Sequence, residues 1–252
     1  MSSIERPSLG EYLRYLRRAS PAARTGRLSR EWVAANAKIS ISYLIRMEQG
    51  SAENPSSECL RRLADTFELS PVQVQHLHDL AKHDLVTPDG DMTRPLVITD
   101  DMREHVDNLS PHLCGFVNER WDVLYANPEY SRIYRSIVDI GNVLKWFFEV
   151  PESRQIMVEW EPEARLTVAW FRALMVRSND SSEFDELLAD LAANADFREM
   201  WNTQEILMGR HSPYMKVRDL DSGQEVFLLA QVYAWPDPTQ RVQMYLGVRS
   251  GR

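Results

Sequence analysis

The sequence has few cysteines and no long apolar run. Cys59 and Cys114 are the only cysteines in 252 residues, too few for a disulfide framework, so we expect both to be small buried residues in a reducing compartment. No apolar stretch approaches the roughly 20 residues that a transmembrane helix needs. The beginning of the chain, MSSIERPSLGEYLRYLRR, is charged throughout, unlike a secretory signal. These features predict a cytoplasmic protein with no membrane partner.

Signatures of the common enzyme classes are also missing. The sequence contains no nucleophile elbow, phosphate-binding loop or dinucleotide fingerprint, so we expect no enzyme and assign no catalytic residue. His76, Asp79 and His83 share one helical face and could bind a metal. His78 lies off that face, however, and the apolar stripe of the same helix explains the pattern. We therefore expect no metal site and no cofactor.

An overall positive charge, which would favour a nucleic-acid partner, is absent as well. The chain has 29 Lys and Arg against 37 Asp and Glu, a net charge of −8. The distribution is uneven, because residues 1–50 carry nine Lys and Arg and only four acidic residues. That segment has a charge of +5 and the remainder −13. Since phosphate binding needs a basic surface, the asymmetry indicates that the N-terminal part meets an anion.

Residues 8–83 have the apolar spacing of five short helices. A serine that can cap a helix precedes four of them, and a proline follows one of these serines, as is typical of a first helical turn. The predicted caps are Ser29, Ser40, Ser56 or Ser57, and Ser70 before Pro71. Gly50 is expected to end the third helix. The predicted core residues of the second and third helices are Trp32, Val33, Ala34, Ile41, Leu44, Ile45 and Met47.

The second and third helices lie in the string RLSREWVAANAKISISYLIRMEQG, which is followed by Pro55 and by CLRRLADTFEL. With these strings, residues 8–83 resemble the five-helix DNA-binding domain of phage-repressor-type bacterial regulators, the xenobiotic-response-element family. The resemblance implies an all-α helix-turn-helix domain, here assigned to residues 1–83. Its third helix would enter the major groove of double-stranded DNA.

The same resemblance assigns roles to eight residues of this domain. Ile41, Ser42 and Arg46 fall where the family reads bases, and Arg46 can pair bidentately with guanine. Ser29, Arg30 and Ser40 fall where the family contacts phosphates or caps helices, and Tyr43 could do either. Lys38 replaces the usual glycine of the turn.

Several alternatives stay open for the charged residues. Lys38 either strains the turn or adds a phosphate contact. Arg46 could instead be a solvated arginine or pair with Glu48 or Glu53, whereas Glu48 itself is expected to be structural. Three arginines of the first helix are either phosphate contacts or a solvated face: Arg14, Arg17 and Arg18.

Residues 84–106 are assigned as a linker, because DLVTPDGDMTRPLVITDD contains two prolines, one glycine and five acidic residues. Residues 107–252 show a strand pair, a helical middle, interrupted at Pro162, and three closing strands. This order predicts an α+β domain with a five-stranded antiparallel sheet and helices over one face. We expect the middle closing strand to be central and buried on both faces. In the last strand, Val242, Met244, Leu246 and Val248 alternate with Arg241, Gln243 and Tyr245, which predicts one buried face.

The strings GFVNERWDVLYANP and FREMW, together with the closing hairpins, resemble the MmyB-like ligand-binding domain. The resemblance implies a PAS-like domain that holds a fatty acid or a similar small apolar ligand. Its many aromatic residues either fill a core or line a pocket. The candidate ligand contacts are Trp121, Phe147, Trp170, Arg172, Trp201, Phe227 and Tyr245. For an acidic head group, Arg172 is favoured over Lys216, His211 and Arg120, although a structural ion pair would explain each of them.

These features together predict a ligand-responsive transcription regulator that binds a DNA operator as a homodimer. Two copies would present two third helices about 34–36 Å apart, one turn of DNA. In the alternative hypothesis, the C-terminal domain only dimerises or binds a protein partner and holds no ligand.

Overall fold

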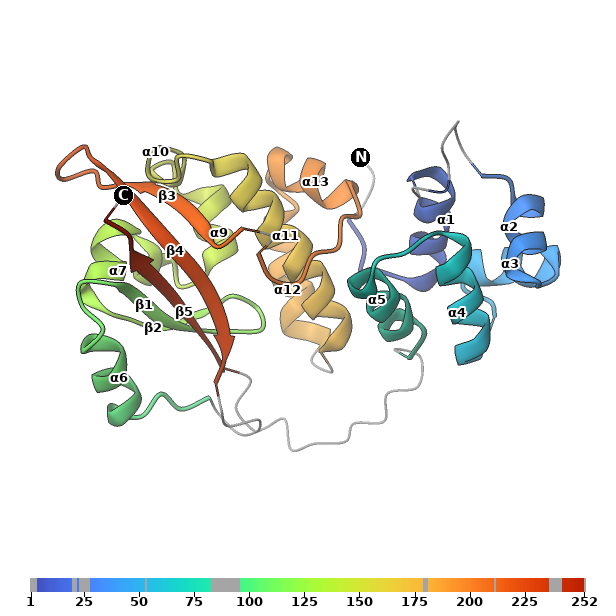
Figure 1. Cartoon of the computed structure of the whole chain (residues 1–252), viewed down its shortest axis with the longest axis horizontal. Coiled ribbons are helices and arrows are strands. Elements are labelled where there is room, and N and C mark those ends of the chain that lie inside the picture. Colours follow the sequence, from blue (N-terminus) through green and yellow to red (C-terminus); the bar gives the residue numbers. More distant parts are fainter. Residues whose placement is uncertain are drawn as a thin grey trace. The chain divides into compact units, whose positions relative to one another are not determined.

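The computed structural model describes residues 4–19, 22, 28–52, 54–82, 96–178, 181–210, 212–235 and 242–251. Its helices and strands form two compact units. The N-terminal unit contains helices α1 to α5, and the C-terminal unit contains helices α6 to α13 and strands β1 to β5 (Figure 1).

A serine hydroxyl accepts a hydrogen bond from a backbone N–H at the start of each of the five N-terminal helices. The bounds are α1 Leu9–Ala19, α2 Arg30–Ala37, α3 Ile41–Glu48, α4 Ser57–Thr66 and α5 Pro71–Lys82. The hydroxyl oxygens of Ser29, Ser40 and Ser56 each accept a hydrogen bond from the backbone N–H of the residue three positions later. Each cap satisfies an N–H that has no partner within its helix. The five predicted helices and these caps are confirmed.

The core of this unit contains fewer residues of α2 and α3 than the sequence pattern predicts. Val33, Leu44 and Met47 are buried, but Trp32 and Ile41 are each 42% exposed. Placing the last two in the core was therefore wrong. Each of α2 and α3 has only eight residues, so each buries a narrow face. Trp32 precedes the buried Val33 and lies on the adjacent side of α2. Ile41 is the first residue of α3 and lies one turn before the buried residues of that helix.

The sheet of the C-terminal unit joins strands from both ends of its sequence. The strands are β1 Leu113–Asn118, β2 Val123–Ala126, β3 Tyr214–Arg218, β4 Glu225–Ala234 and β5 Val242–Arg249. They pair antiparallel in the order β2-β1-β5-β4-β3. The predicted α+β domain with a five-stranded antiparallel sheet is confirmed, whereas its PAS-like character stays a prediction.

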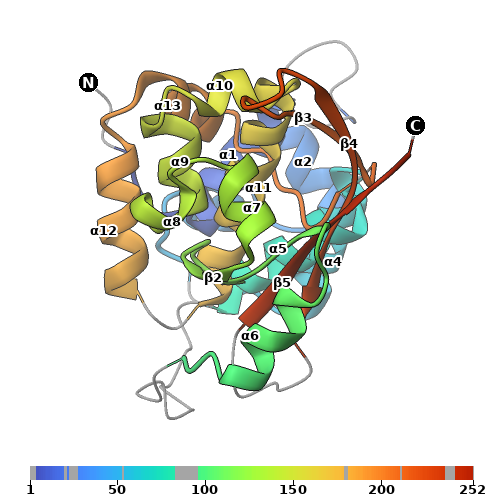
Figure 2. The ribbon, with the colours of Figure 1, turned by 90° about the vertical axis from the view of Figure 1, so that its left-hand side faces the viewer.

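The helices of this unit divide between the two faces of the sheet (Figure 2). One face packs on α6, Asp100–Asp107, through Met102 and Val106. The chain between β2 and β3 supplies the helices of the other side. These are α7 Pro128–Ile133, α8 Ile137–Ile140, α9 Val143–Glu149, α10 Ser153–Ile156, α11 Trp160–Arg177, α12 Ser181–Leu191 and α13 Ala195–Asn202. Pro162 lies in the first turn of α11, where the missing N–H does no harm.

Helix α6 lies partly inside the segment assigned as a linker. Residues 83–95 are outside the described residues, but residues 100–106 form most of α6 and contribute to the core against the sheet. Asn127 joins this helix to the sheet. Its side chain donates to the carbonyl oxygens of Val106 and His112 and accepts from the N–H groups of Cys114 and Tyr130. The amide of Asn127 is fully buried and makes four hydrogen bonds.

Alternate residues of β5 face opposite sides of the sheet, and both sides are covered. Val242, Met244 and Leu246 pack against the α6 cluster, while Tyr245 lies beneath the helices on the other side. The expectation of a single buried face was therefore wrong, because helices also cover the face of Tyr245, which the alternation predicts to be exposed.

The expectation for β4 also fails. Its inner face is buried at Leu228 and Ala230, but Leu229 and Tyr233 on the outer face are 37% and 48% exposed, and Tyr214 of neighbouring β3 is 50% exposed. The central strand is β5, and β4 lies next to the edge strand. Trp235, the residue that follows β4, packs against the α6 cluster.

Candidate functional site

The turn between α2 and α3 places Lys38 in the left-handed region, with φ of 54°. The N–H groups of Lys38 and Ile39 donate to the carbonyl oxygens of Ala35 and Ala34, which closes α2. A side chain in this conformation costs about 1–2 kcal/mol. The turn is therefore strained, which was the first of the two alternatives for Lys38. The ammonium group is exposed, and a phosphate contact therefore stays a prediction.

One face of α3 presents polar and apolar groups to solvent. Ile41, Ser42 and Arg46 are exposed, and Tyr43 is half-buried. The guanidinium of Arg46 lies 5.6 Å from the centre of the Tyr43 ring, an arrangement that favours the cation electrostatically. An extended arginine beside short polar side chains suits the edges of base pairs in a major groove.

Glu48 at the end of α3 pairs with other arginines and not with Arg46. Its carboxylate accepts from Nε and Nη2 of Arg17 and from Nε of Arg30, the last at 2.8 Å. Arg14 donates to the backbone oxygen of Glu48. Burial opposes the charge of Glu48, but the hydrogen bonds from Arg17 and Arg30 outweigh it and hold its pKa below the ordinary value. Glu53, the other proposed partner of Arg46, lies outside the described residues.

This cluster decides the role of the arginines in α1. Arg17 is 2% exposed, so it is neither a phosphate contact nor part of a solvated face, and Glu48 is structural as predicted. Arg18 is exposed. Arg30 is anchored to Glu48, yet 41% of its side chain stays exposed. Together with the capping Ser29, it can offer N–H groups to a phosphate beside α3.

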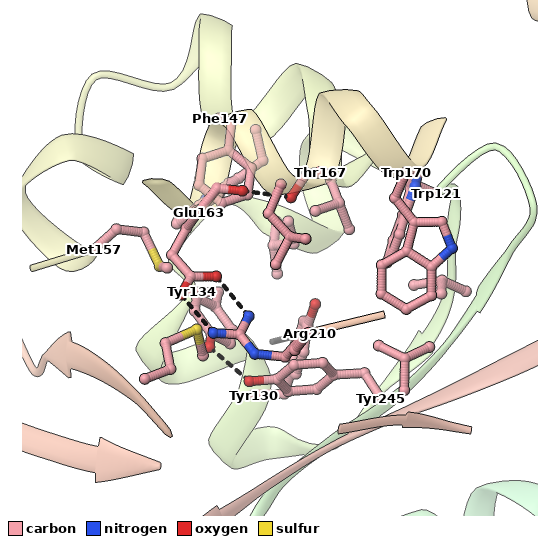
Figure 3. Close-up of a pocket in the computed structure, with 17 residues that line it drawn as sticks. Trp121, Tyr130, Tyr134, Phe147, Met157, Glu163, Thr167, Trp170, Arg210 and Tyr245 are labelled. Carbon is pink, nitrogen blue, oxygen red and sulfur yellow. Dashed lines mark hydrogen bonds and ion pairs between the residues drawn. The ribbon is translucent and has the colours of Figure 1, made fainter. Parts of the chain in front are cut away.

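A second candidate site lies in the C-terminal unit, where a cavity separates the sheet from the helices (Figure 3). The centre of a water-sized sphere can move through about 70 Å³ of it. The lining side chains come from the inner face of β1, β3, β4 and β5, from helices α7, α8, α9 and α11, and from the segments between elements. They are Val117, Trp121, Tyr130, Tyr134, Ile137, Val143, Trp146, Phe147, Met157, Glu163, Leu166, Thr167, Trp170, Arg210, Met215, Val232 and Tyr245.

Helix α11 supplies one wall of this cavity. Glu163, Leu166, Thr167 and Trp170 stand at i, i+3, i+4 and i+7 and therefore share one helical face. Three of them are carbon-rich, but Glu163 places a carboxylate on the same wall. The indole of Trp121 meets that of Trp170 edge to face, with 5.1 Å between ring centres, so the cavity has an aromatic end.

The charges in this wall are paired. Two guanidinium nitrogens of Arg210 donate to the two carboxylate oxygens of Glu163, each at 2.5 Å, and Nε of Arg210 donates to the carbonyl of Ser212 at 3.1 Å. Burial alone would lower the pKa of Arg210, but hydrogen bonds and charge from Glu163 raise it above the ordinary value. The fork-to-fork geometry is the strong form of such a pair.

Three buried phenols lie close to the ion pair. The hydroxyl groups of Tyr134 and Tyr245 are 2.9 Å apart. Burial raises the pKa of these two tyrosines and that of Tyr130. Gly247 makes room for this arrangement, because a Cβ there would lie 2.8 Å from the Tyr245 hydroxyl.

The structure brings some of the predicted ligand contacts together and separates others. Trp121, Phe147, Trp170 and Tyr245 line the cavity, while Arg172, Trp201 and Phe227 lie outside its lining. Their role in ligand binding stays a prediction.

The favoured head-group residue, Arg172, is engaged elsewhere. It is 1% exposed, donates to the backbone oxygen of Trp201, and lies 3.8 Å from the centre of the Trp201 ring. Lys216 lies over Phe227, and Arg120 pairs with Asp122 and Glu183. His211 is outside the described residues.

Neither charged residue of the cavity, Glu163 or Arg210, was among the predicted ligand contacts. A usable signal existed for Glu163, because a lone acid interrupts the i, i+3, i+4, i+7 stripe of an otherwise apolar helical face. No local pattern marks Arg210, which stands in an irregular segment 47 residues away from its partner.

Other kinds of site find little support in the parts of the chain that the structure describes. Over those residues, no three His, Cys, Asp or Glu side chains gather closely enough to hold a metal ion, although His83 lies outside them. In the same ranges, none of the helices has both the length and the apolar character needed to cross a bilayer. Cys59 and Cys114 are free and buried.

Comparison with known families assigns both units. The family model for the MmyB-like transcription regulator ligand-binding domain matches residues 98–247. A helix-turn-helix domain model matches residues 8–77. No curated protein matches the chain significantly.

Proposed function

The chain belongs to the family of MmyB-like transcription regulators, and we propose that it binds an operator in double-stranded DNA through α3 while a small apolar ligand in the cavity sets its affinity for that operator. It combines a helix-turn-helix domain with a ligand-binding domain. The observation that carries the proposal is the largely apolar cavity in the second of these domains.

The DNA-binding part of the proposal rests on the exposed face of α3. Ile41, Ser42 and Arg46 are exposed there, and Glu48 at the other end of the helix is held by Arg17 and Arg30. The buried Arg17–Glu48 pair and the partly exposed Arg30–Glu48 pair fix the direction of α3. Its exposed side chains are therefore already positioned when the helix enters a groove. A helix-turn-helix protein reads a palindromic operator as a dimer, with half-sites about 34–36 Å apart. We propose a homodimer for this reason.

A fatty acid is the ligand class that we propose first for testing. The cavity of about 70 Å³ is small beside the ~300–1,000 Å³ that drug-sized ligands occupy. A short chain suits it as it stands, whereas a long chain requires its walls to move apart. A ligand changes DNA affinity only if it binds the two DNA-affinity states of the protein with different strength.

Native mass spectrometry of the purified protein, followed by denaturation and organic extraction, tests the ligand. A molecule released only on denaturation supports the proposal and names the ligand class. Fluorescence anisotropy with an operator obtained by selection from random DNA then tests the coupling. Equal affinity for that operator with and without the extracted molecule would contradict control by the ligand.

A second candidate function has its own observation. Tyr214, Leu229 and Tyr233 form an exposed apolar strip on the outer face of β3 and β4, and such strips are typical of interaction surfaces. In this alternative the domain only dimerises or binds a protein. A Tyr233→Ser variant that becomes monomeric by light scattering, in a protein that releases no molecule on denaturation, would favour it.

A further inference from the structure

We propose that the cavity accepts its ligand only in electrically neutral form, so that a carboxylic acid binds together with one proton. This inference rests on the proposed ligand cavity and narrows the chemistry of the ligand. It follows from the charges in the cavity wall, where Glu163 and Arg210 are joined at the centre of the residues drawn in Figure 3.

Arg210 is the single basic residue among the described residues that line the cavity, and its charge is already balanced. Of its five N–H groups, one donates to Ser212 and two donate to Glu163. The remaining two can donate to an oxygen of a ligand. They offer hydrogen bonds without an excess of positive charge, which suits a hydroxyl or carbonyl oxygen better than a carboxylate.

The other titratable groups that face the ion pair do not change this balance. They are the phenols of Tyr130, Tyr134 and Tyr245, which come from α7, from the end of that helix and from β5. Burial keeps all three phenols neutral at physiological pH. Thr167, Leu166 and Trp170 on the same face of α11 carry no charge. The lining as a whole therefore has no net charge.

A carboxylate that entered this cavity would leave one buried negative charge without a partner. An uncompensated charge in an apolar environment is strongly unfavourable, and such a site takes up a proton instead. The proton therefore resides on the carboxyl group of the ligand, because Glu163 keeps its charge through the ion pair with Arg210. An alcohol of the same length needs no proton.

The probes for the test are hexan-1-ol and hexanoic acid, six-carbon chains chosen because the cavity is small. Dissociation constants are measured with the full-length protein by isothermal titration calorimetry from about pH 6 to about pH 8, far above the ordinary pKa of a carboxyl group, about 4.3. Uptake of one proton weakens hexanoic acid about tenfold for each pH unit. The affinity for hexan-1-ol should not change. Titrations in two buffers with different protonation enthalpies count the protons directly.

Variants separate the charge of the cavity wall from its shape. In Glu163→Gln the charge of Arg210 becomes free, so hexanoate should bind as the anion, its pH dependence should disappear, and its affinity near pH 8 should rise roughly tenfold or more. In the double variant Glu163→Gln/Arg210→Gln the cavity is again without charge, and the pH dependence should return. Glu161→Gln removes an exposed carboxylate that pairs with Arg165 on the same helix and should behave as the wild type.

The outcomes distinguish this inference from the proposed function. If hexanoate binds the wild type with the same affinity across the pH range and without proton uptake, the inference is wrong but the ligand cavity stands. If neither probe binds, both are contradicted. Should Glu163→Gln fail to fold, the proton count of the wild type and the double variant still decide the question.

Discussion

Arg17 donates hydrogen bonds to both carboxylate oxygens of Glu48 inside the N-terminal unit, and the two side chains are 3% and 1% exposed. The pair joins α1 to the end of α3, the helix that presents Arg46. Gly10 lets the two helices approach, because a Cβ at that position would lie 2.7 Å from the backbone oxygen of Glu48. The geometry of the DNA-binding face thus depends on a contact that is itself hidden from DNA.

Glu48→Gln should destabilise the domain strongly. Removing one partner of a buried pair leaves Arg17 without its counter-charge, at a cost of about 3–5 kcal/mol, measured by urea unfolding. Glu31→Gln, an exposed change in the same domain, should cost much less. Equal losses of unfolding free energy in the two variants would show that the buried pair contributes no more to stability than an exposed carboxylate.

The same residue predicts an acid dependence. The pKa of Glu48 is lower in the folded protein than in the unfolded chain, so its contribution is complete above the unfolded carboxyl pKa of about 4.3 and is lost as the pH falls through the folded pKa. The unfolding free energy of the wild type should decrease in that window more steeply than that of Glu48→Gln. Parallel pH curves would contradict this assignment.

Lys38→Gly should stabilise the helix-turn-helix domain. Glycine adopts the positive φ of this turn without strain, but it also raises the entropy of the unfolded chain, which offsets part of the benefit. We expect the free energy of unfolding, measured by urea denaturation, to rise by up to about 1 kcal/mol. Lys38→Ala removes the same charge and keeps the strain. If both variants lose DNA affinity equally and lower the salt dependence by about one charge, Lys38 contacts a phosphate; unchanged affinity in both would remove it from the interface.

Arg46→Ala should weaken operator binding by roughly 1–3 kcal/mol and relax specificity at one base position. Anisotropy titrations with the operator and with single-position variants of it measure both effects. An equal loss on every sequence would identify a phosphate contact. Arg18→Ala, an exposed arginine of α1, is the matched control, and a loss in this control as large as in Arg46→Ala would count against a base-reading role.

Arg172→Met should lower stability and leave ligand selectivity unchanged. The guanidinium of Arg172 donates to the Trp201 backbone oxygen and lies over its ring, contacts worth about 2–4 kcal/mol together in a buried site. Thermal unfolding measures the loss. A changed ratio of the affinities for hexanoic acid and hexan-1-ol in the folded variant would return Arg172 to the ligand site.

The features that sequence predicted well depend on neighbours along the chain. Ser29 and Ser40 were recognisable as caps because each hydroxyl meets an N–H only three residues onward. The alternation in β5 likewise follows from the geometry of any strand. The helix-turn-helix motif was therefore identifiable, and so was the antiparallel sheet with helices beside it.

The features that sequence predicted poorly depend on distant partners. Nothing near Trp32 indicates that α2 leaves it exposed, and nothing near Tyr245 indicates that helices cover it on a sheet whose opposite face packs on α6. The sequence likewise contains no sign of where the candidate head-group residues Arg172, Lys216 and Arg120 pack, since a partner of each lies at a distant position in the chain.

The sequence by itself determined where the helices of the N-terminal domain begin and which family the two domains resemble, because those signals are carried by residues within a few positions of one another. Only the tertiary structure decided the electrostatics of the two sites. Arg17 meets Glu48 across 31 residues and Arg210 meets Glu163 across 47. The charge of a buried group is governed by what packs against it, and packing brings together residues that the chain keeps far apart.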